Sequence, residues 1–477
     1  MSDSSAGAGA GRGTPPKNDR REVFGWKMYD WANSAFSTTV AGVFLGEYTT
    51  RLAQKELGEN GALLTVAGYD LVTAKSFFPL CITVSVILQA LLLPVLGAVA
   101  DYSNLKKRLL AVFCYLGAAA TCLTFFVAGP LYLLGGVLFV VANLSFGAAL
   151  VLYNAFLPEI TTEDQRDKVS SRGFAYGYLG GGLLLLLNFV LLQAGPGRLG
   201  ISEEMAVRLS LLSAGVWWAA FALVTFARLK TRAPARLLPP GRGFLTVGFT
   251  ELKGTFRELR RLRQTLRFLV GYLFYNDGIQ TVIGMAAVFL GQELFVARGR
   301  EPDRAFLSGV FLMVQFTAIF GALLFERIAR KTGTKRAIAA SLVVWVFIIV
   351  YAYGWLQTAA QAWAMAAAIA VVLGGSQALS RSLFSRMIPA GRESSFFGLY
   401  EISERGTSWI GPLVFGGVVA LTNSYRQAIL SLVVFFFVGL VVLLTTDADR
   451  AVHEAGNLLP EEVGGGGVVR GAAATGS

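Results

Sequence analysis

Residues 109–158 read LLAVFCYLGAAATCLTFFVAGPLYLLGGVLFVVANLSFGAALVLYNAFLP, and none of these side chains carries a charge. An α-helix needs about 20 apolar residues to cross a bilayer, so this run is long enough for two spanning helices. Further charge-free windows cover residues 81–100, 173–193, 337–379 and 427–446. The sequence therefore predicts a polytopic, all-α membrane protein.

Composition excludes several classes of function. Of the 477 residues, 54% are hydrophobic and only 15% are charged, whereas soluble domains carry about 25% charged residues. The three cysteines, Cys81, Cys114 and Cys122, lie in apolar runs, and His453 is the only histidine. This set provides no histidine- or cysteine-based catalytic site or metal site. We therefore expect no enzyme activity, no metal and no cofactor.

The apolar runs predict twelve spanning helices in two six-helix bundles. The N-terminal bundle covers residues 24–228 and the C-terminal bundle covers 267–446, with a linker at 229–266 between them and disordered cytoplasmic tails at 1–23 and 447–477. The expected spans are 24–48, 75–100, 108–128, 131–154, 172–193, 207–228, 267–291, 305–326, 336–356, 359–384, 395–421 and 425–446.

The distribution of basic residues predicts the orientation. With both termini inside, the cytoplasmic segments hold 32 of the 42 lysines and arginines and the outer segments hold 9. Basic residues concentrate in cytoplasmic loops of membrane proteins, so we expect both termini to be cytoplasmic. The net charge of +12 is then a topology signal and does not indicate nucleic-acid binding.

The linker contains its own amphipathic pattern. Five apolar residues recur near helical spacing among basic residues: Phe249, Leu252, Phe256, Leu259 and Leu266. Two interpretations stay open: a basic helix on the inner leaflet, or a solvated linker helix.

The two halves resemble each other in polar positions. Tyr29-Asp30-Trp31 in the first predicted helix corresponds to Tyr275-Asn276-Asp277 in the seventh, 246 residues later. Transporters are often duplicated halves with the substrate site between them. We therefore expect Asp30, Asn33, Asp277 and Gln280 to face one central cavity.

A short loop after the second helix predicts a conformational latch. Its glycine allows close helix approach, and its aspartate can pair with a group across the bundle; a plain topogenic loop with a solvated aspartate is the alternative. The residues assigned to this latch and its weaker second copy are Gly97, Asp101, Lys107, Arg108 and Glu326.

Ionisable residues inside a membrane are expensive and usually functional. Two of the intramembrane carboxylates could instead have a purely structural role, each in an ion pair within its own helix. Asp30 could pair with Lys27, and Glu401 could pair with Arg405. Amides can bind a zwitterion or join helices. The candidate substrate- and proton-binding residues are Asp30, Asn33, Asn154, Asn276, Asp277, Gln280, Gln377, Glu401 and Glu404.

Four short motifs resemble a known family. They are YDWANSAF at 29–36, YNDG at 275–278, SRS at 380–382 and FGLY at 397–400. Together they are similar to the vacuole-effluxer-like branch of the major facilitator superfamily, whose familiar fungal member is a vacuolar amino-acid effluxer. The resemblance implies a major facilitator fold and, by alternating access, export of neutral amino acids.

A short tail and linker are typical of a bacterial chain, so we expect the protein to lie in the cell (inner) membrane, surrounded by lipid. We also expect it to be a monomer and to move a small molecule. Coupling to protons is one mechanism that the carboxylates allow. Efflux of drugs or another metabolite, and a membrane scaffold or sensor without transport, remain the alternatives.

Overall fold

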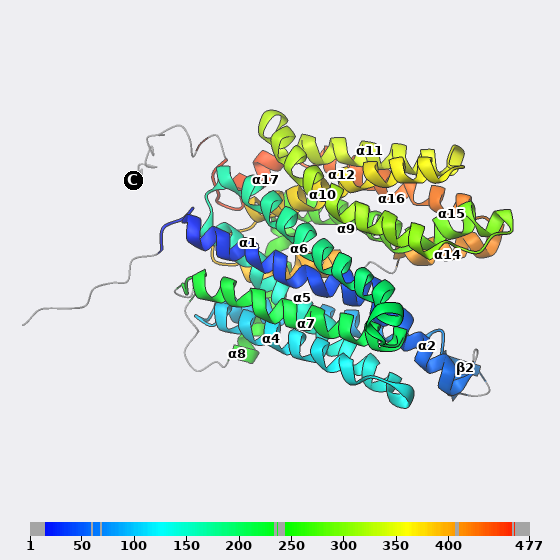
Figure 1. Cartoon of the computed structure of the whole chain (residues 1–477). Coiled ribbons are helices and arrows are strands. Elements are labelled where there is room, and N and C mark those ends of the chain that lie inside the picture. The colour runs from blue at the N-terminus through cyan, green and yellow to red at the C-terminus, as the bar shows by residue number, and fades with distance from the viewer. Residues whose placement is uncertain are drawn as a thin grey trace, which may run out of the picture.

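The computed structural model describes residues 15–58, 61–66, 69–232, 236, 244–405, 410–459 and 462, and it is dominated by long helices in two groups (Figure 1). The first group comprises α1 (Arg20–Ala35), the π-helix η1 (Phe36–Phe44), α2 (Leu45–Leu57), α3 (Phe77–Asp101), α4 (Lys106–Leu123), α5 (Tyr132–Ile160), α6 (Arg166–Ala194) and α7 (Glu203–Arg228). The second comprises α9 (Arg263–Leu294), α10 (Arg304–Thr332), α11 (Thr334–Gly354), α12 (Ala359–Arg386), α13 (Glu393–Arg405), α14 (Ile410–Thr422), α15 (Tyr425–Ser431) and α16 (Val433–Thr445).

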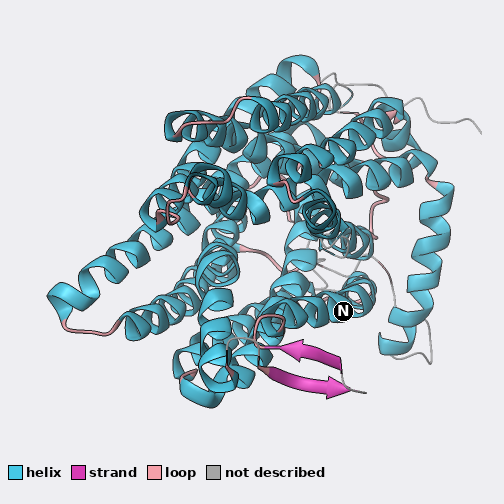
Figure 2. Ribbon diagram, turned by 90° about the vertical axis from the view of Figure 1, so that its right-hand side faces the viewer, coloured by secondary structure: helices cyan, strands magenta, loops and turns pink. Residues whose placement is uncertain are grey.

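The remaining elements are short or lie at the ends of the bundle. The linker carries α8 (Phe244–Arg261), and α17 (Ala448–Glu454) follows the last long helix, inside the segment that we assigned to a tail. A hairpin of β1 (Ala62–Val66) and β2 (Tyr69–Thr73) joins α2 to α3 (Figure 2). The single-turn helices are η2 (Thr124–Phe126), η3 (Gly129–Leu131), η4 (Glu163–Gln165), the π-helical η5 (Gly195–Leu199) and η6 (Val296–Arg298).

Several helices start where a polar side chain satisfies free backbone amides. Asp19 accepts from the N–H of Arg21 at the start of α1, Ser202 caps α7, and Asp303 caps α10. Thr358 opens α12 with a full capping box. These polar residues therefore mark where the helices begin after the loops.

The described part of the chain contains ten helices that are long and apolar enough to cross a membrane. The expected first span, 24–48, is helical throughout but is divided among α1, η1 and α2. The expected eleventh span, 395–421, is divided between α13 and α14, on either side of residues 406–409, which lie outside the described residues. The multi-pass all-α fold is thus confirmed, and the count of twelve stays a prediction.

The two groups of helices meet along two seams. α3 packs along α13, and α6 packs along α10 and α12. The first seam is tight at Gly97, where an added Cβ would lie 2.3 Å from the carbonyl oxygen of Ser394. α1 begins and α17 ends at the same end of the bundle, opposite the hairpin (Figure 1). We call the end that carries α17 the closed end, for the contacts described next.

Candidate functional site

Asp30 of α1 and Arg381 of α12 form an ion pair between the two halves. Arg381 Nη2 lies 3.2 Å from Asp30 Oδ2, and the two residues are only 3% and 8% exposed. Gly173 of α6 lies against the pair, because an added Cβ there would be 2.6 Å from Asp30 Oδ2. The backbone of α6 therefore lies directly against the two charges, with no room for a side chain at residue 173.

The Arg381 guanidinium binds almost entirely to the half of the chain to which it does not belong. Its Nε donates to Ser170 Oγ at 2.9 Å, and Nη2 donates to the Ser170 carbonyl at 3.0 Å. The rings of Trp26 and Phe174 lie 4.9 and 4.3 Å from its central carbon. A charged side chain at membrane depth is tolerated when it is paired in this way.

Asn154 of α5 connects the ion pair to a second acid. Its Oδ1 accepts from Arg381 Nη1 at 3.3 Å, and its Nδ2 donates to Glu401 Oε1 at 2.8 Å. Glu401 is 1% exposed. We call Asp30, Asn154, Ser170, Arg381 and Glu401 the interhalf cluster; it holds one cation and two carboxylates.

Other predicted site residues surround the interhalf cluster in the second half. Gln377 accepts a hydrogen bond from Tyr178 Oη across the halves at 3.1 Å. Glu404 accepts from Tyr272 Oη at 3.0 Å, and its carbonyl accepts from Asn276 Nδ2 at 3.1 Å. These bonds tie α13 to α9.

Asp277 occupies a different position, beside the start of α14. Its Oδ2 accepts from the N–H of Gly411 at 2.9 Å, and its Oδ1 has no hydrogen-bond partner among the described residues. Asn33 is buried and its Nδ2 is likewise unpartnered within the described part of the chain, whereas Gln280 is half-buried. A common cavity for Asp30, Asn33, Asp277 and Gln280 therefore stays a prediction.

Asp101 binds the start of α13 at the closed end. Its two oxygens accept from the N–H groups of Ser394 and Ser395 at 2.9 and 2.8 Å and from Ser395 Oγ at 2.6 Å. A carboxylate is favoured at a helix N-terminus, where the free amides and the helix dipole are positive. The contact that the loop motif predicts is therefore present, between α3 and a helix of the other half.

The cation beside Asp101 is Lys106, the first residue of α4. Its Nζ lies 3.9 Å from Asp101 and 2.5 Å from Glu159 at the end of α5. The next two residues, Lys107 and Arg108, are half-buried and exposed, respectively. The structure thus places the cation of the latch one residue earlier than the sequence pattern indicated.

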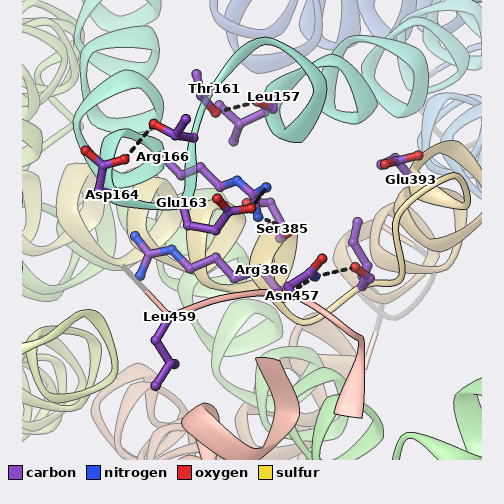
Figure 3. Close-up of polar contacts among 12 residues, drawn as sticks. Leu157, Thr161, Glu163, Asp164, Arg166, Ser385, Arg386, Glu393, Asn457 and Leu459 are labelled. Carbon is purple, nitrogen blue, oxygen red and sulfur yellow. Dashed lines mark hydrogen bonds and ion pairs between the residues drawn. The ribbon is translucent and has the colours of Figure 1, made fainter. Parts of the chain in front are cut away.

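A second set of contacts closes the seam between α6 and α12, as Figure 3 shows around Arg166, Ser385 and Arg386. Arg166 donates to the Ser385 carbonyl at 2.8 Å. Asp167 pairs with Arg386 at 2.9 Å and accepts from Thr334 Oγ1 at 2.7 Å.

Glu326, which we assigned to the second copy of the latch, pairs with Arg330 of its own helix at 3.3 Å. Asp167 on α6 makes the contacts across the halves that Glu326 was expected to make.

A family model described as vacuole effluxer Atg22 like matches residues 18–456. The chain belongs to the vacuole effluxer Atg22-like family. It is 29% identical to an uncharacterized MFS-type transporter of Bacillus subtilis over 91% of this chain and 97% of that protein. It is 28% identical to autophagy-related protein 22-2 of Penicillium rubens, over 91% and 88% of the two chains.

Comparison with solved structures shows that this chain has the major facilitator fold. The human organic anion transporter MFSD10 superimposes with a TM-score of 0.62 at 15% identity, over 90% of this chain and all of that one. The transporter FucP in its outward conformation gives 0.61 at 12% identity, over 90% and 99%. This Atg22-like chain is thus a transporter of the major facilitator type and not an enzyme, and the resemblance seen in its motifs is confirmed.

Two residues of this site were not among the sequence-predicted set. Arg381 stands between two serines in the SRS motif, which is itself a signal, but the sequence pattern gave it no partner. Ser170 of α6 gave no signal, because a single serine near a helix start has many ordinary roles.

Proposed function

We propose that this protein exports a small zwitterionic solute, with neutral amino acids as the substrate class, and that the interhalf cluster binds it. The observation that carries the proposal is the buried Asp30–Arg381 pair. Each partner belongs to a different half, so alternating access must separate the two charges.

Separated buried charges need new partners, because an unpaired charge is far more costly to bury than a paired one. An amino-acid zwitterion supplies both partners at once. Its carboxylate matches the guanidinium of Arg381, and its ammonium group matches Asp30 or Glu401. A solute without charges leaves both Asp30 and Arg381 unsatisfied.

The family description supports the direction of transport, because it contains the word effluxer. We further propose that both termini are cytoplasmic, which makes the closed end the cytoplasmic one, and that the monomer works in the cell membrane. The state described is then closed to the cytoplasm, with Asp101 as the latch.

Proton coupling is a further part of the proposal, and it involves carboxylates both inside and outside the interhalf cluster. Glu401, Glu404 and Asp277 are carboxylates within the spanning region, and Asp277 has one oxygen without a partner in the described part of the chain. A carboxylate that gains and loses a proton can link a gradient to the movement of the halves.

The test is substrate-induced thermal stabilisation of the purified protein. We expect one or more neutral amino acids to raise the melting temperature of the wild type, and Arg381→Gln to abolish the shift. Arg386→Gln is the matched control: Arg386 is also a buried arginine of α12 that contacts the other half, but its partner is Asp167 at the closed end. The control should retain the shift.

Stabilisation by uncharged metabolites or by lipophilic cations, with no response to amino acids, would contradict the proposal and favour efflux of another compound. No response to any solute would favour a scaffold or sensor.

A further inference from the structure

The linker helix α8 is docked on the closed end rather than suspended between the halves. It packs along α3, and an added Cβ on Gly248 would lie 2.8 Å from a side-chain carbon of Val95. Thr255 and Leu259 of the same face are 2% and 5% exposed. α8 is therefore fixed to the first half of the chain.

The same face of α8 holds an arginine of the second half. Arg392 Nη2 lies 2.7 Å from Glu251 Oε2 and 3.0 Å from Thr255 Oγ1, and Arg392 also pairs with Glu258. Arg236 of the linker joins this network, donating to Glu251 at 3.3 Å and to Tyr102 Oη at 2.9 Å. Arg392 is 6% exposed, so these partners replace water around its charge.

The position of Arg392 makes α8 part of the latch. Arg392 directly precedes α13, and Ser394 and Ser395 follow it at the point where Asp101 accepts their amide hydrogens. When the closed end opens, α13 must leave α3. Either the bonds of Arg392 to α8 break, or α8 leaves α3 with it.

The opposite face of α8 has a different chemistry. Lys253, Phe256, Arg257 and Arg260 are exposed, and Phe256 has 51% of its surface accessible. At 100° per residue these four lie on one side of the helix, about 180° from Glu251, Thr255 and Glu258. An exposed ring among three cations is the pattern of a helix that lies on an anionic bilayer surface.

Two more exposed arginines follow α8 in the sequence, on α9. Arg263 and Arg267 of α9 stand beside a groove of about 440 Å³ between α9 and α16. The groove is otherwise lined by Leu266, Val270, Val442 and Thr445. Two guanidinium groups above an apolar groove suit the phosphate and the acyl chain of one lipid.

We propose that the outer face of α8, with the groove between α9 and α16, binds anionic phospholipid, and that this binding holds α8 in place and keeps the closed end shut. Charge complementarity selects the occupant, since three of the four exposed side chains on this face are cationic. The acids of α8 lie on the opposite face and bind Arg392. The conformational effect rests on the latch proposed above. Lipid binding itself does not.

Hydrogen exchange in nanodiscs tests the proposal without a known substrate. Exchange at the start of α13, residues 393–401, is compared in phosphatidylcholine alone and with added phosphatidylglycerol. In the wild type, phosphatidylglycerol should slow this exchange by at least about tenfold, given three cations near the surface. The triple variant Lys253→Gln, Arg257→Gln, Arg260→Gln should show the same exchange in both lipids.

The matched control is a second triple variant, Arg20→Gln, Lys168→Gln, Arg172→Gln, because it also removes three exposed cations from the same end of the bundle. It should keep the response. A wild-type response equalled by soluble inorganic phosphate, or a control that loses the response equally, would overturn the lipid proposal. Fast exchange of residues 393–401 in every lipid would instead overturn the latch, so the two failures are distinguishable.

Discussion

At the residue scale, the interhalf cluster depends on one pair of opposite charges from different halves, Asp30 and Arg381. Asp30 was singled out, yet Lys27, three residues before it, was its nearest candidate partner. In the structure Lys27 Nζ lies 4.9 Å from the ring of Tyr176, while Asp30 pairs with Arg381, 351 residues away. Helical spacing identifies local partners. It gives no information on which helices of the two halves face each other.

The Asp30–Arg381 pair predicts strong energetic coupling. Asp30→Asn leaves a buried guanidinium without its counter-ion, a change that costs about 3–5 kcal/mol in comparable pairs. The double variant Asp30→Asn, Arg381→Gln should recover most of this loss, because no buried charge is left alone. The measurement is the free energy of unfolding in detergent. Additive losses in the double-mutant cycle would mean that the two charges do not interact.

A side chain added at Gly97 should open the seam between α3 and α13 at the closed end. In Gly97→Val, side-chain atoms would occupy the space of the Ser394 carbonyl, so α3 and α13 should separate. Spin labels on the exposed residues Asn104 and Ala390, in opposite halves, should report a longer distance.

The control for this change is Gly416→Val on α14, where an added Cβ meets no atom within 4 Å. An unchanged distance between the labels in Gly97→Val would show that the seam tolerates the side chain.

At the element scale, apolar length predicted most helices but not their interruptions. The run at 24–48 gave no sign of the π-helical segment Phe36–Phe44, because π-helical bonding depends on the neighbours of a helix rather than on its composition. The run at 395–421 likewise gave no sign that Asp277 would accept from Gly411 at the start of α14. The sixth span, expected at 207–228, begins earlier in the structure, at Glu203, because Ser202 caps the helix there.

Substitution of Asp277 should affect proton-coupled transport without affecting folding of the protein. Asn in its place can still accept from the Gly411 amide, so Asp277→Asn should fold and insert normally. It cannot exchange a proton, so gradient-driven accumulation in vesicles should vanish while exchange without a gradient survives. If Asp277 instead binds the substrate ammonium group, binding should be lost at every pH. Wild-type rates and pH dependence would assign Asp277 a structural role.

At the scale of the whole molecule, the described state is closed by contacts at one end. Three sets of contacts join the halves between that end and Tyr178. They are the bonds of Asp101 to α13, the pair of Asp167 with Arg386, and the interhalf cluster. The apolar runs allowed the two-bundle fold to be predicted, and the duplicated polar motifs predicted the likeness of the helices that carry Asp30 and Asp277. The asymmetry of the latches was not predictable, because Asp167 replaces Glu326 through packing of α6 that no local pattern encodes.

The central claim is that a zwitterionic solute takes the place of the Asp30–Arg381 pair as the halves move. The most direct measurement is exchange of a radiolabelled neutral amino acid across proteoliposomes that contain the wild type, Arg381→Gln or Arg386→Gln. We predict exchange by the wild type, altered but measurable exchange by Arg386→Gln, and none by Arg381→Gln. Wild-type exchange by well-folded Arg381→Gln would contradict the account.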